Sequence, residues 1–457
     1  MILFYQNIAI DLKPVYPYFC VAKLTVLCHQ GIGTMNKWII CTFATMVLSS
    51  LAANAQDGML TVGGYGEVAM TRNFYNDSPY IYAKPDNYRN APGHGRFDIP
   101  HAVVYIGYNF GKGWSMQSEI EFEHTGTGAA IEREYEEAGE FEQEIEKGGE
   151  VELEQFWIQK CFLPQLNIRM GHIVVPVGGL NNAHEPLNFF TVYRPEGEYT
   201  ILPSTWHDTG ISIWGQAGPW RYEALMVAGL DAFMFNTDNF IKKGAGSPYE
   251  FKVANTCGFA GRIDNTSVRN LRLSLSGWYG HSMHNTYPND LKGDGLKYDS
   301  AKGRVLIGSF DFAYTGGRLI VRGNADYATL TDATDISKAK AVRAANDSPY
   351  SKEPVGRAAY ALGMEAGYDI LPWFKIKDKE QKLFIFGRGE AYNPYIPAAG
   401  QQSATYTEKL RLACGLNWIP VPQIAVKCEY SHRFLKSEYI DEPSISLGIA
   451  YMGFFRH

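Results

Sequence analysis

Leu271-Arg272-Leu273-Ser274-Leu275-Ser276 alternates strictly between apolar and polar side chains. Successive side chains of a β-strand point to opposite faces, so the leucines share one face while the arginine and serines share the other. The same period of two recurs along the chain after residue 55. The pattern predicts an all-β protein whose strands have one apolar and one polar face.

Alternation and turn signals together predict about sixteen strands, or fourteen if one weak pair merges. The connections between them are alternately short and long, which indicates an up-and-down meander with two different ends. We expect an antiparallel transmembrane β-barrel with short periplasmic turns, long extracellular loops and a third loop folded into the lumen. The expected strands span residues 59–72, 97–109, 113–125, 150–161, 165–175, 208–217, 220–229, 251–264, 268–280, 301–314, 317–329, 356–371, 382–395, 405–418, 422–435 and 443–455.

A soluble β-sandwich shows the same alternation, with its apolar face turned inward. Two features favour the barrel. The expected strands are longer than the five or six residues that are usual in soluble domains. Aromatic residues (29 Tyr, 25 Phe and 9 Trp) cluster near strand ends, as they do at membrane interfaces.

The N-terminal region carries an export signal. Residues 35–55 read MNKWIICTFATMVLSSLAANA, with a basic start, a short apolar run and a small-residue cleavage motif before Gln56. Residues 1–34 would bury this signal, so we interpret them as a non-native extension and expect translation to begin at Met35. Residues 56–457 then form a single outer-membrane β-barrel domain, because no hinge or repeat divides them.

Composition excludes several classes of function. A net charge of −6 with scattered basic residues argues against nucleic-acid binding. Cysteines in the expected mature chain are far apart, so we expect neither a disulfide framework nor a cofactor or metal site. They are Cys161, Cys257, Cys414 and Cys428.

The third long connection, residues 176–207, is too apolar for a loop that extends into water. Sixteen strands enclose an aqueous channel, and a loop that packs on the inner wall would narrow it. We expect the pore constriction to include His184, Glu185, Arg194, Glu196 and Glu198. The alternative is a loop packed over the barrel mouth or at a subunit contact.

Strand parity also assigns charged side chains to the inner wall. Charges of opposite sign on facing walls would orient polar solutes, whereas direct pairing between them would only stiffen the barrel. The expected lumen-wall residues are Arg169, Arg262, Arg272, Arg318, Arg322, Arg388, Arg411, Lys427, Arg433, Glu119, Glu121 and Asp326. The glutamate-rich run 132–154 is expected to form a solvated second loop, in which divalent cations could bridge to lipopolysaccharide.

Several stretches resemble Gram-negative outer-membrane porins, especially the phosphate-selective O/P type and its Bacteroidetes relatives. They are GGYGEV at 63–68, RMGHIVVPVG at 169–178, HEPLNFFTVYRPEGEYTILPSTWHDTGISIWG at 184–215, and the final strand, which ends in Phe455 followed by Arg456 and His457. The resemblance implies a passive channel, a homotrimer, and a location in the outer membrane in contact with lipid and lipopolysaccharide. Ions or small hydrophilic solutes would be its cargo. Phosphate preference is not carried over, because residues 176–207 contain no lysine.

Two other classes of function stay open. An outer-membrane hydrolase would need a nucleophile and a base in contact, and candidates are His281 with Ser282 and His284, His184 with Glu185, or His207 with Asp208. HEP at 184–186 lacks the HExxH spacing of a zinc protease. A non-conducting surface receptor or adhesin is supported only by loop length. Conductance in a planar bilayer separates the porin from both.

Overall fold

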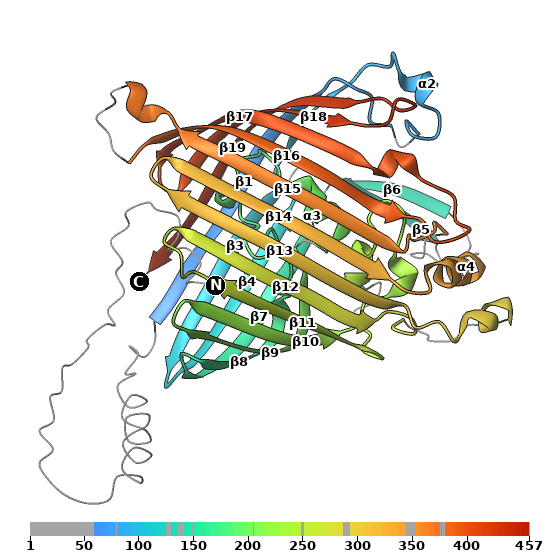
Figure 1. Cartoon of the computed structure of the whole chain (residues 1–457), viewed down its shortest axis with the longest axis horizontal. Helices are drawn as coiled ribbons and strands as arrows, with labels where there is room; N and C mark the ends of the chain where they lie inside the picture. The colour runs from blue at the N-terminus through green and yellow to red at the C-terminus, as the bar shows by residue number, and fades with distance from the viewer. Residues whose placement is uncertain are drawn as a thin grey trace, which may run out of the picture.

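A computed structural model describes residues 59–456, apart from 79, 125–128, 136–140, 148–149, 204, 248–250, 287–292, 344–351, 375 and 377–379. The expected extension (1–34) and signal peptide (35–55) lie outside these residues. Strands of the main sheet form a closed antiparallel barrel, shown in Figure 1. The sheet has seventeen strands, and sixteen cross the barrel when β2 and β3 are counted as one interrupted strand.

The barrel strands are β1 (Met59–Asn73), β2 (Gly95–Asp98), β3 (His101–Gly111), β4 (Trp114–Glu123), β7 (Glu150–Leu163), β8 (Leu166–Val174), β9 (His207–Ala217), β10 (Trp220–Ala228), β11 (Cys257–Asn265), β12 (Leu271–His281), β13 (Arg304–Gly316), β14 (Leu319–Leu330), β15 (Ala358–Asp369), β16 (Lys382–Ile396), β17 (Lys409–Val421), β18 (Ile424–Phe434) and β19 (Glu442–Arg456). The connections contain β5 (Ala129–Tyr135), β6 (Phe141–Lys147), α2 (Pro85–Tyr88), α3 (Glu196–Ile201), α4 (Ala333–Arg343) and the 3₁₀ turns η2 (Pro186–Asn188), η3 (Ala232–Met234), η4 (Lys242–Ala245), η5 (Gly293–Tyr298), η6 (Leu371–Phe374) and η7 (Thr405–Thr407). No helix among the described residues is long and apolar enough to cross a membrane.

Pairing between the first and last strands closes the ring. β1 pairs with β19 from Thr61↔Arg456 to Asn73↔Ser444, and its other edge pairs with β2 and β3. The β2–β3 break contains Pro100, which has no backbone N–H to donate to the ladder. Closure leaves no unpaired strand edge, and in hydrocarbon an unpaired edge would have nothing to bond.

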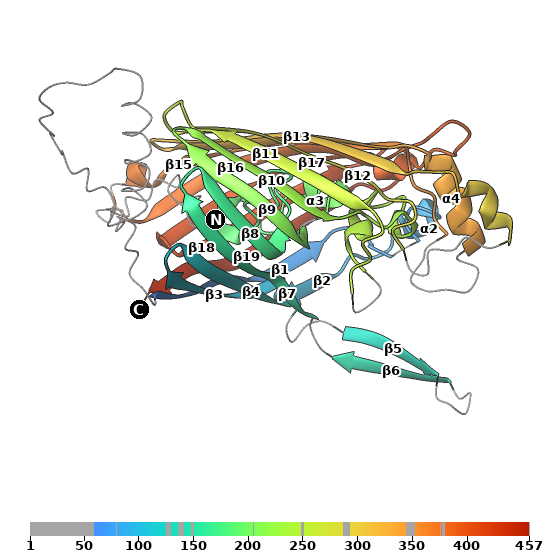
Figure 2. The ribbon, with the colours of Figure 1, turned by 90° about the horizontal axis from the view of Figure 1, so that it is seen from below.

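The two ends of the barrel differ. Short turns close one end, and Gly317 in the β13–β14 turn has the positive φ of 58° that tight hairpins require. The long connections gather at the other end, where Figure 1 places α2 and α4. The β5–β6 hairpin projects away from this end in Figure 2. It carries part of the acidic run 132–154, whose side chains up to residue 150 lie outside the described part of the chain.

Burial along the strands is the reverse of that in a soluble protein. On β12, Leu275 is 64% exposed, whereas Ser274 and Ser276 are buried. Exposed apolar side chains recur on the outer face of the barrel, and buried polar ones recur on the inner face. This arrangement suits a lipid-facing exterior and a polar interior. The barrel prediction is confirmed.

Two expected details are wrong. The strand expected to begin at residue 251 begins at Cys257, because Lys252 turns back and its Nζ donates to the Ala245 and Gly246 carbonyls. Arg318 does not lie on a strand: the β13–β14 turn occupies residues 317–318, and the side chain is exposed.

The inner face is not polar throughout. An apolar cluster of buried side chains joins strands between β7 and β16 to the loops, and it includes Trp278, Ile307 and Leu330. Lys340 of α4 crosses this region, and its Nζ donates to the Phe235 and Glu353 carbonyls. Loops therefore occupy part of the lumen at the end of the barrel that carries the long connections.

A single charge on the outer face tests the membrane orientation. Leu275→Arg should lower the free energy of unfolding in lipid vesicles by about 2–4 kcal/mol, because the arginine would face hydrocarbon near mid-depth. Leu296→Arg is the control, since Leu296 is equally exposed but lies in η5, outside the strands. Equal effects of the two changes in urea unfolding would contradict the assignment of faces.

Candidate functional site

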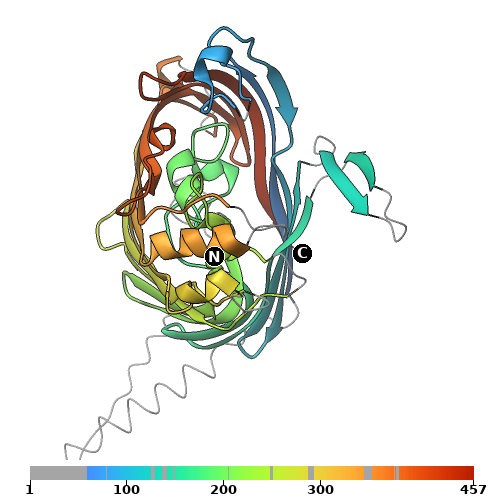
Figure 3. The same cartoon turned by 90° about the vertical axis from the view of Figure 1, so that its right-hand side faces the viewer.

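The connection between β8 and β9, residues 175–206, crosses the lumen. We call it loop 3. It contains η2 and α3, and it bonds to the inner faces of strands on opposite sides of the ring. In the end-on view of Figure 3, green segments lie inside the ring of strands.

Wall side chains hold the backbone of loop 3. Lys427 on β18 donates to the carbonyls of Pro186 (2.5 Å), Phe189 (3.0 Å) and Thr191 (2.9 Å). Asn417 on β17 donates to the Phe190 carbonyl at 2.8 Å. These side chains supply hydrogen-bond donors to loop carbonyl groups that have no donor from regular secondary structure.

Carboxylates of the wall accept from loop N–H groups. Glu429 accepts from Val192 at 2.7 Å, Glu390 from Gly197 at 3.0 Å, and Glu365 from Phe190 at 3.4 Å. The three acceptors come from β18, β16 and β15. Loop 3 is therefore bonded to the wall by both its donors and its acceptors.

Glu196, at the start of α3, is held by two arginines of the wall. Arg433 contacts it at 2.7 and 2.5 Å, and Arg411 lies 3.3 Å away. Burial alone would raise the pKa of Glu196, but these guanidinium groups outweigh burial and hold the pKa well below its usual range. Tyr392 adds a hydrogen bond of 3.0 Å.

Glu198 organises the loop from within. Its carboxylate accepts from the backbone N–H groups of Gly179, Leu180 and Asn181, at 2.8–3.2 Å. Burial, together with the nearby Asp326 and Asp311, raises the pKa of Glu198 well above its usual range. Glu198 thus shapes the first turn of loop 3, which Arg262 of β11 fixes through the Gly178 carbonyl at 2.9 Å.

Arg194 and His184 lie against β1 and β4. Arg194 donates to the Tyr65 hydroxyl at 3.3 Å and lies 3.7 Å from Glu121. The opposite face of loop 3 borders a cavity of about 140 Å³, which reaches Glu185, Glu198, Arg272, Arg322 and Arg388 but not Arg194. The structure thus separates the five residues expected at the constriction: two border this cavity, and the other three contact the wall.

Most of the expected lumen-wall residues face inward and form ion pairs. Arg388 bonds to Glu365 (3.2 Å) and Glu390 (3.1 Å), and Arg411 bonds to Glu390 (2.8 Å) and Glu429. This chain of pairs joins β15, β16, β17 and β18. Arg262, Arg272 and Asp311 form a similar group on β11, β12 and β13. These contacts fit the predicted pairing of wall charges, and the orienting field from charges on facing walls stays a prediction.

Two further expected wall residues are also buried, and Arg169 lies 3.8 Å from Glu223. Arg169 stacks over Trp157 and Trp214, at 4.9 and 5.7 Å from the ring centroids. Asp326 accepts from Asn324 at 2.6 Å. The sequence did not mark the wall carboxylates that accept from loop 3, namely Glu365, Glu390 and Glu429, as a group. Alternation along a strand gives the face of a residue but not its partner.

The hydrolase candidates do not form a triad. The Ser282 hydroxyl donates to the Gly303 carbonyl at 2.7 Å, and His281 neighbours Tyr279. His207 lies 3.1 Å from Glu154, and Asp208 lies 3.6 Å from Lys252. None of these contacts joins a nucleophile to a base.

A comparison with solved structures supports the barrel fold. No protein-family model matches the chain. A relative from Aquifex aeolicus (strain VF5), described as an uncharacterized protein, is 27% identical over 388 residues, which is 84% of this chain and 77% of the relative. The anion-selective porin from Comamonas acidovorans superposes with a TM-score of 0.51 at 8% identity, covering 87% of this chain and 100% of the porin. The outer membrane channel DcaP of Acinetobacter baumannii gives 0.49 at 9% identity, covering 87% and 98%. The likeness to the Comamonas porin shows a shared fold, and the phosphate-selective O/P resemblance stays a prediction.

Removing the charge of Glu196 should weaken the attachment of loop 3. Glu196→Gln leaves Arg411 and Arg433 without their carboxylate, and we expect a loss of about 3 kcal/mol in the free energy of unfolding. Glu408→Gln breaks the exposed pair with Lys436 and should cost clearly less, because solvent screens the two charges. Urea unfolding measures the stability of both variants, and equal losses would contradict a stabilising role for the contacts of Glu196 with Arg411 and Arg433.

The contacts of Glu196 with the two arginines also predict that the stability of the barrel depends on pH. The pKa of Glu196 is lower in the folded state, so its contribution is present above the unfolded pKa of about 4.3 and is lost as the pH falls toward the folded value. The stability difference between parent and Glu196→Gln should therefore shrink below about pH 4. A difference that stays constant between about pH 7 and pH 3 would refute this role.

Proposed function

We propose that this protein is an outer-membrane porin, a water-filled channel for the passive diffusion of ions and small hydrophilic solutes. The observation that carries the proposal is the reversed burial of the sixteen barrel strands, with apolar side chains outside and charged ones inside. A closed barrel of this size has room for an aqueous path beside its inner loop. The fold shared with an anion-selective porin supports the same role.

We also propose a preference for anions. Arg322 and Arg272, which border the cavity beside loop 3, have side chains that are 21% and 14% exposed. Their partners Glu365 and Asp311 are 1% and 2% exposed. The positive member of each pair thus faces water while the negative one is covered. A solute in the cavity would meet guanidinium groups first.

Loop 3 would form the narrow section. In this proposal Glu185 and Glu198 border the path, while Arg194, Glu196 and His184 keep the loop against the wall. The acidic run 132–154 would stay outside, where bulk salt screens its charges over about 8–10 Å.

The remaining parts of the proposal concern assembly. The mature chain would begin at Gln56 after removal of the signal peptide, insert into the outer membrane of a Gram-negative bacterium, contact lipopolysaccharide and form a homotrimer. Native mass spectrometry of the detergent-purified barrel should show three copies. A monomer at all concentrations would remove the trimer and leave the channel proposal intact.

Planar-bilayer recording tests the channel itself. The purified barrel should give open steps whose size rises with salt concentration, because ions cross through water. An irrelevant outer-membrane protein of non-channel type, purified in the same way, is the control. Bilayers that stay sealed would contradict the porin and favour a non-conducting receptor or a hydrolase.

Arg322→Gln tests the anion preference. A unit charge about 6 Å from a permeating ion contributes about 0.7 kcal/mol in water, with opposite sign for anions and cations, so the ratio of anion to cation permeability should fall about tenfold. Arg318→Gln is the matched control, since Arg318 is exposed in the turn of the same hairpin and does not border the cavity. Equal reversal potentials in Arg322→Gln and the parent would contradict the assignment.

A further inference from the structure

Three buried side chains with metal-ligand atoms meet where loop 3 contacts the wall. Glu119 comes from β4, Glu154 from β7 and His184 from loop 3, and all three are at most 2% exposed. Each offers one ligand atom, and these atoms lie within 4.8 Å of one another. Carboxylate oxygen and imidazole nitrogen together suit divalent transition-metal ions.

One polar atom of each side chain is without a hydrogen-bond partner. They are Oε1 of Glu119, Oε2 of Glu154 and Nε2 of His184. Leaving a buried polar atom unpaired is unfavourable, and more so for a charged group. Three such atoms at one place therefore call for a ligand that can satisfy all of them.

The other polar atom of each side chain is held in place. Gln155 donates to Oε2 of Glu119, and the Thr205 hydroxyl donates to Oε1 of Glu154. Nδ1 of His184 lies 3.1 Å from the Asn181 carbonyl. Such supporting bonds orient metal ligands and leave their free atoms directed at the ion.

The bond to Asn181 also determines the histidine tautomer. A carbonyl only accepts, so Nδ1 of His184 must carry the hydrogen. In the neutral ring Nε2 then presents a lone pair toward Glu119, whose Oε1 is 3.8 Å away. A positive charge between these two atoms, either a proton on Nε2 or a metal ion, removes their repulsion.

Local charge favours a cation as well. Glu119, Glu121 and Glu154 are all buried here, and the permanent positive charge that pairs with this group among the described residues is Arg194, 3.7 Å from Glu121. His207 lies 3.1 Å from Glu154 on the side away from the unpartnered oxygen. A divalent ion would offset the remaining carboxylate charge.

We propose that Glu119, Glu154 and His184 bind one divalent transition-metal ion, which joins loop 3 to the barrel wall. Ligands about 2.0–2.2 Å from such an ion lie roughly 3–4 Å from one another, so the observed separations need only small side-chain movements. Water or Glu121 completes the coordination.

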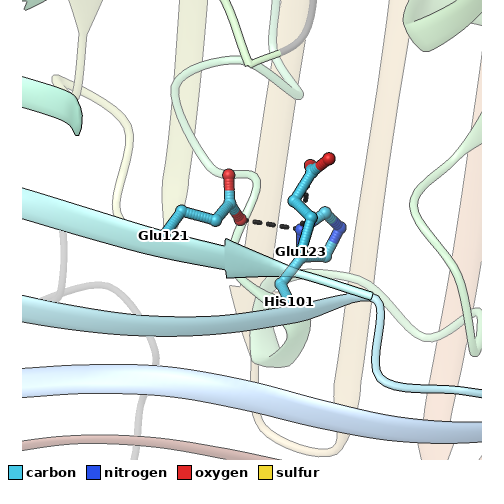
Figure 4. Close-up of side chains that lie close together, drawn as sticks. All are labelled: His101, Glu121 and Glu123. Carbon is cyan, nitrogen blue, oxygen red and sulfur yellow. Dashed lines mark ion pairs between the residues drawn. The ribbon is translucent and has the colours of Figure 1, made fainter. Parts of the chain in front are cut away.

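Further carboxylates lie beside the site on the same strand. Glu119, Glu121 and Glu123 alternate along β4 on the inward face, and the side chain of Glu123 is 28% exposed. Figure 4 shows Glu121 and Glu123 around His101, whose Nδ1 lies 2.7 and 3.6 Å from their oxygens. Carboxylates thus alternate along β4 from the partly exposed Glu123 to the buried Glu119.

Zinc binding tests the proposal directly and needs no channel activity. The barrel is purified in detergent, stripped with a chelator, dialysed against Zn²⁺ and analysed for bound metal. The parent should retain one Zn²⁺ per chain, and heating should unfold the zinc-loaded barrel at a higher temperature than the stripped one. His184→Gln and Glu154→Gln should bind at least tenfold more weakly.

The control is a histidine beside a carboxylate elsewhere in the barrel. His432 on β18 lies 3.2 Å from Asp441, and His432→Gln should bind zinc as the parent does. His184→Cys adds a spectroscopic test, because with Co²⁺ the new thiolate should give a charge-transfer absorption that the parent and His432→Cys lack.

Three outcomes would overturn the proposal. The parent retains no zinc after dialysis, the His184 and Glu154 variants retain as much as the parent, or His184→Cys gives no thiolate band with bound Co²⁺. If a variant fails to fold, as judged by loss of heat-modifiable mobility on gels, X-ray absorption of zinc in the parent decides. Oxygen ligands with one imidazole support the site, and a different ligand set rejects it.

Discussion

The rest of this structure depends on one constraint: the hydrocarbon around the strands cannot form hydrogen bonds with unpaired polar groups. It forces the sheet to close through β1 and β19, and it restricts the outer face to apolar side chains such as Leu275. Polar side chains of the same strands must then point into the lumen. There they need partners, and they find them in one another and in the backbone of loop 3. Bonds from Lys427, Glu390 and Glu429 to that backbone follow from this requirement.

Much of the barrel could be predicted from the sequence, because a strand in lipid must alternate strictly. Leu273 and Ser274 take opposite faces for the same reason that Arg262 and Glu390 turn inward, and the sixteen expected strands all occur. Prediction failed where alternation carries no information. Pro100 interrupts a strand that still pairs on both sides of the break. Phe251, Lys252 and Val253 alternate as in a strand, but they lie in a loop before β11.

The candidate site was less accessible to such reasoning. Loop 3 could be expected inside the barrel from its apolar composition, but parity does not say which wall a loop residue meets. His184 faces Glu119 and Glu154, residues at least thirty positions away, so no local spacing marks the cluster. The contacts of Arg194 with Tyr65 and Glu121 likewise join residues far apart in the sequence, so no local spacing marks them. The apolar packing of Trp278 and Ile307 departs from the usual polar lumen because loops rather than water lie against them.

A designed disulfide tests most directly whether loop 3 is bound to the inner wall. A Cβ built on Gly448 of β19 would lie 4.0 Å from Cβ of Val192, which is within the range that a disulfide spans. The double variant Val192→Cys with Gly448→Cys should therefore cross-link on oxidation of the folded barrel, seen as altered mobility of the denatured chain without reductant. Val192→Cys with Leu447→Cys should not, because Leu447 faces lipid. Absence of the first cross-link, or equal cross-linking of both pairs, would contradict a loop held inside the barrel.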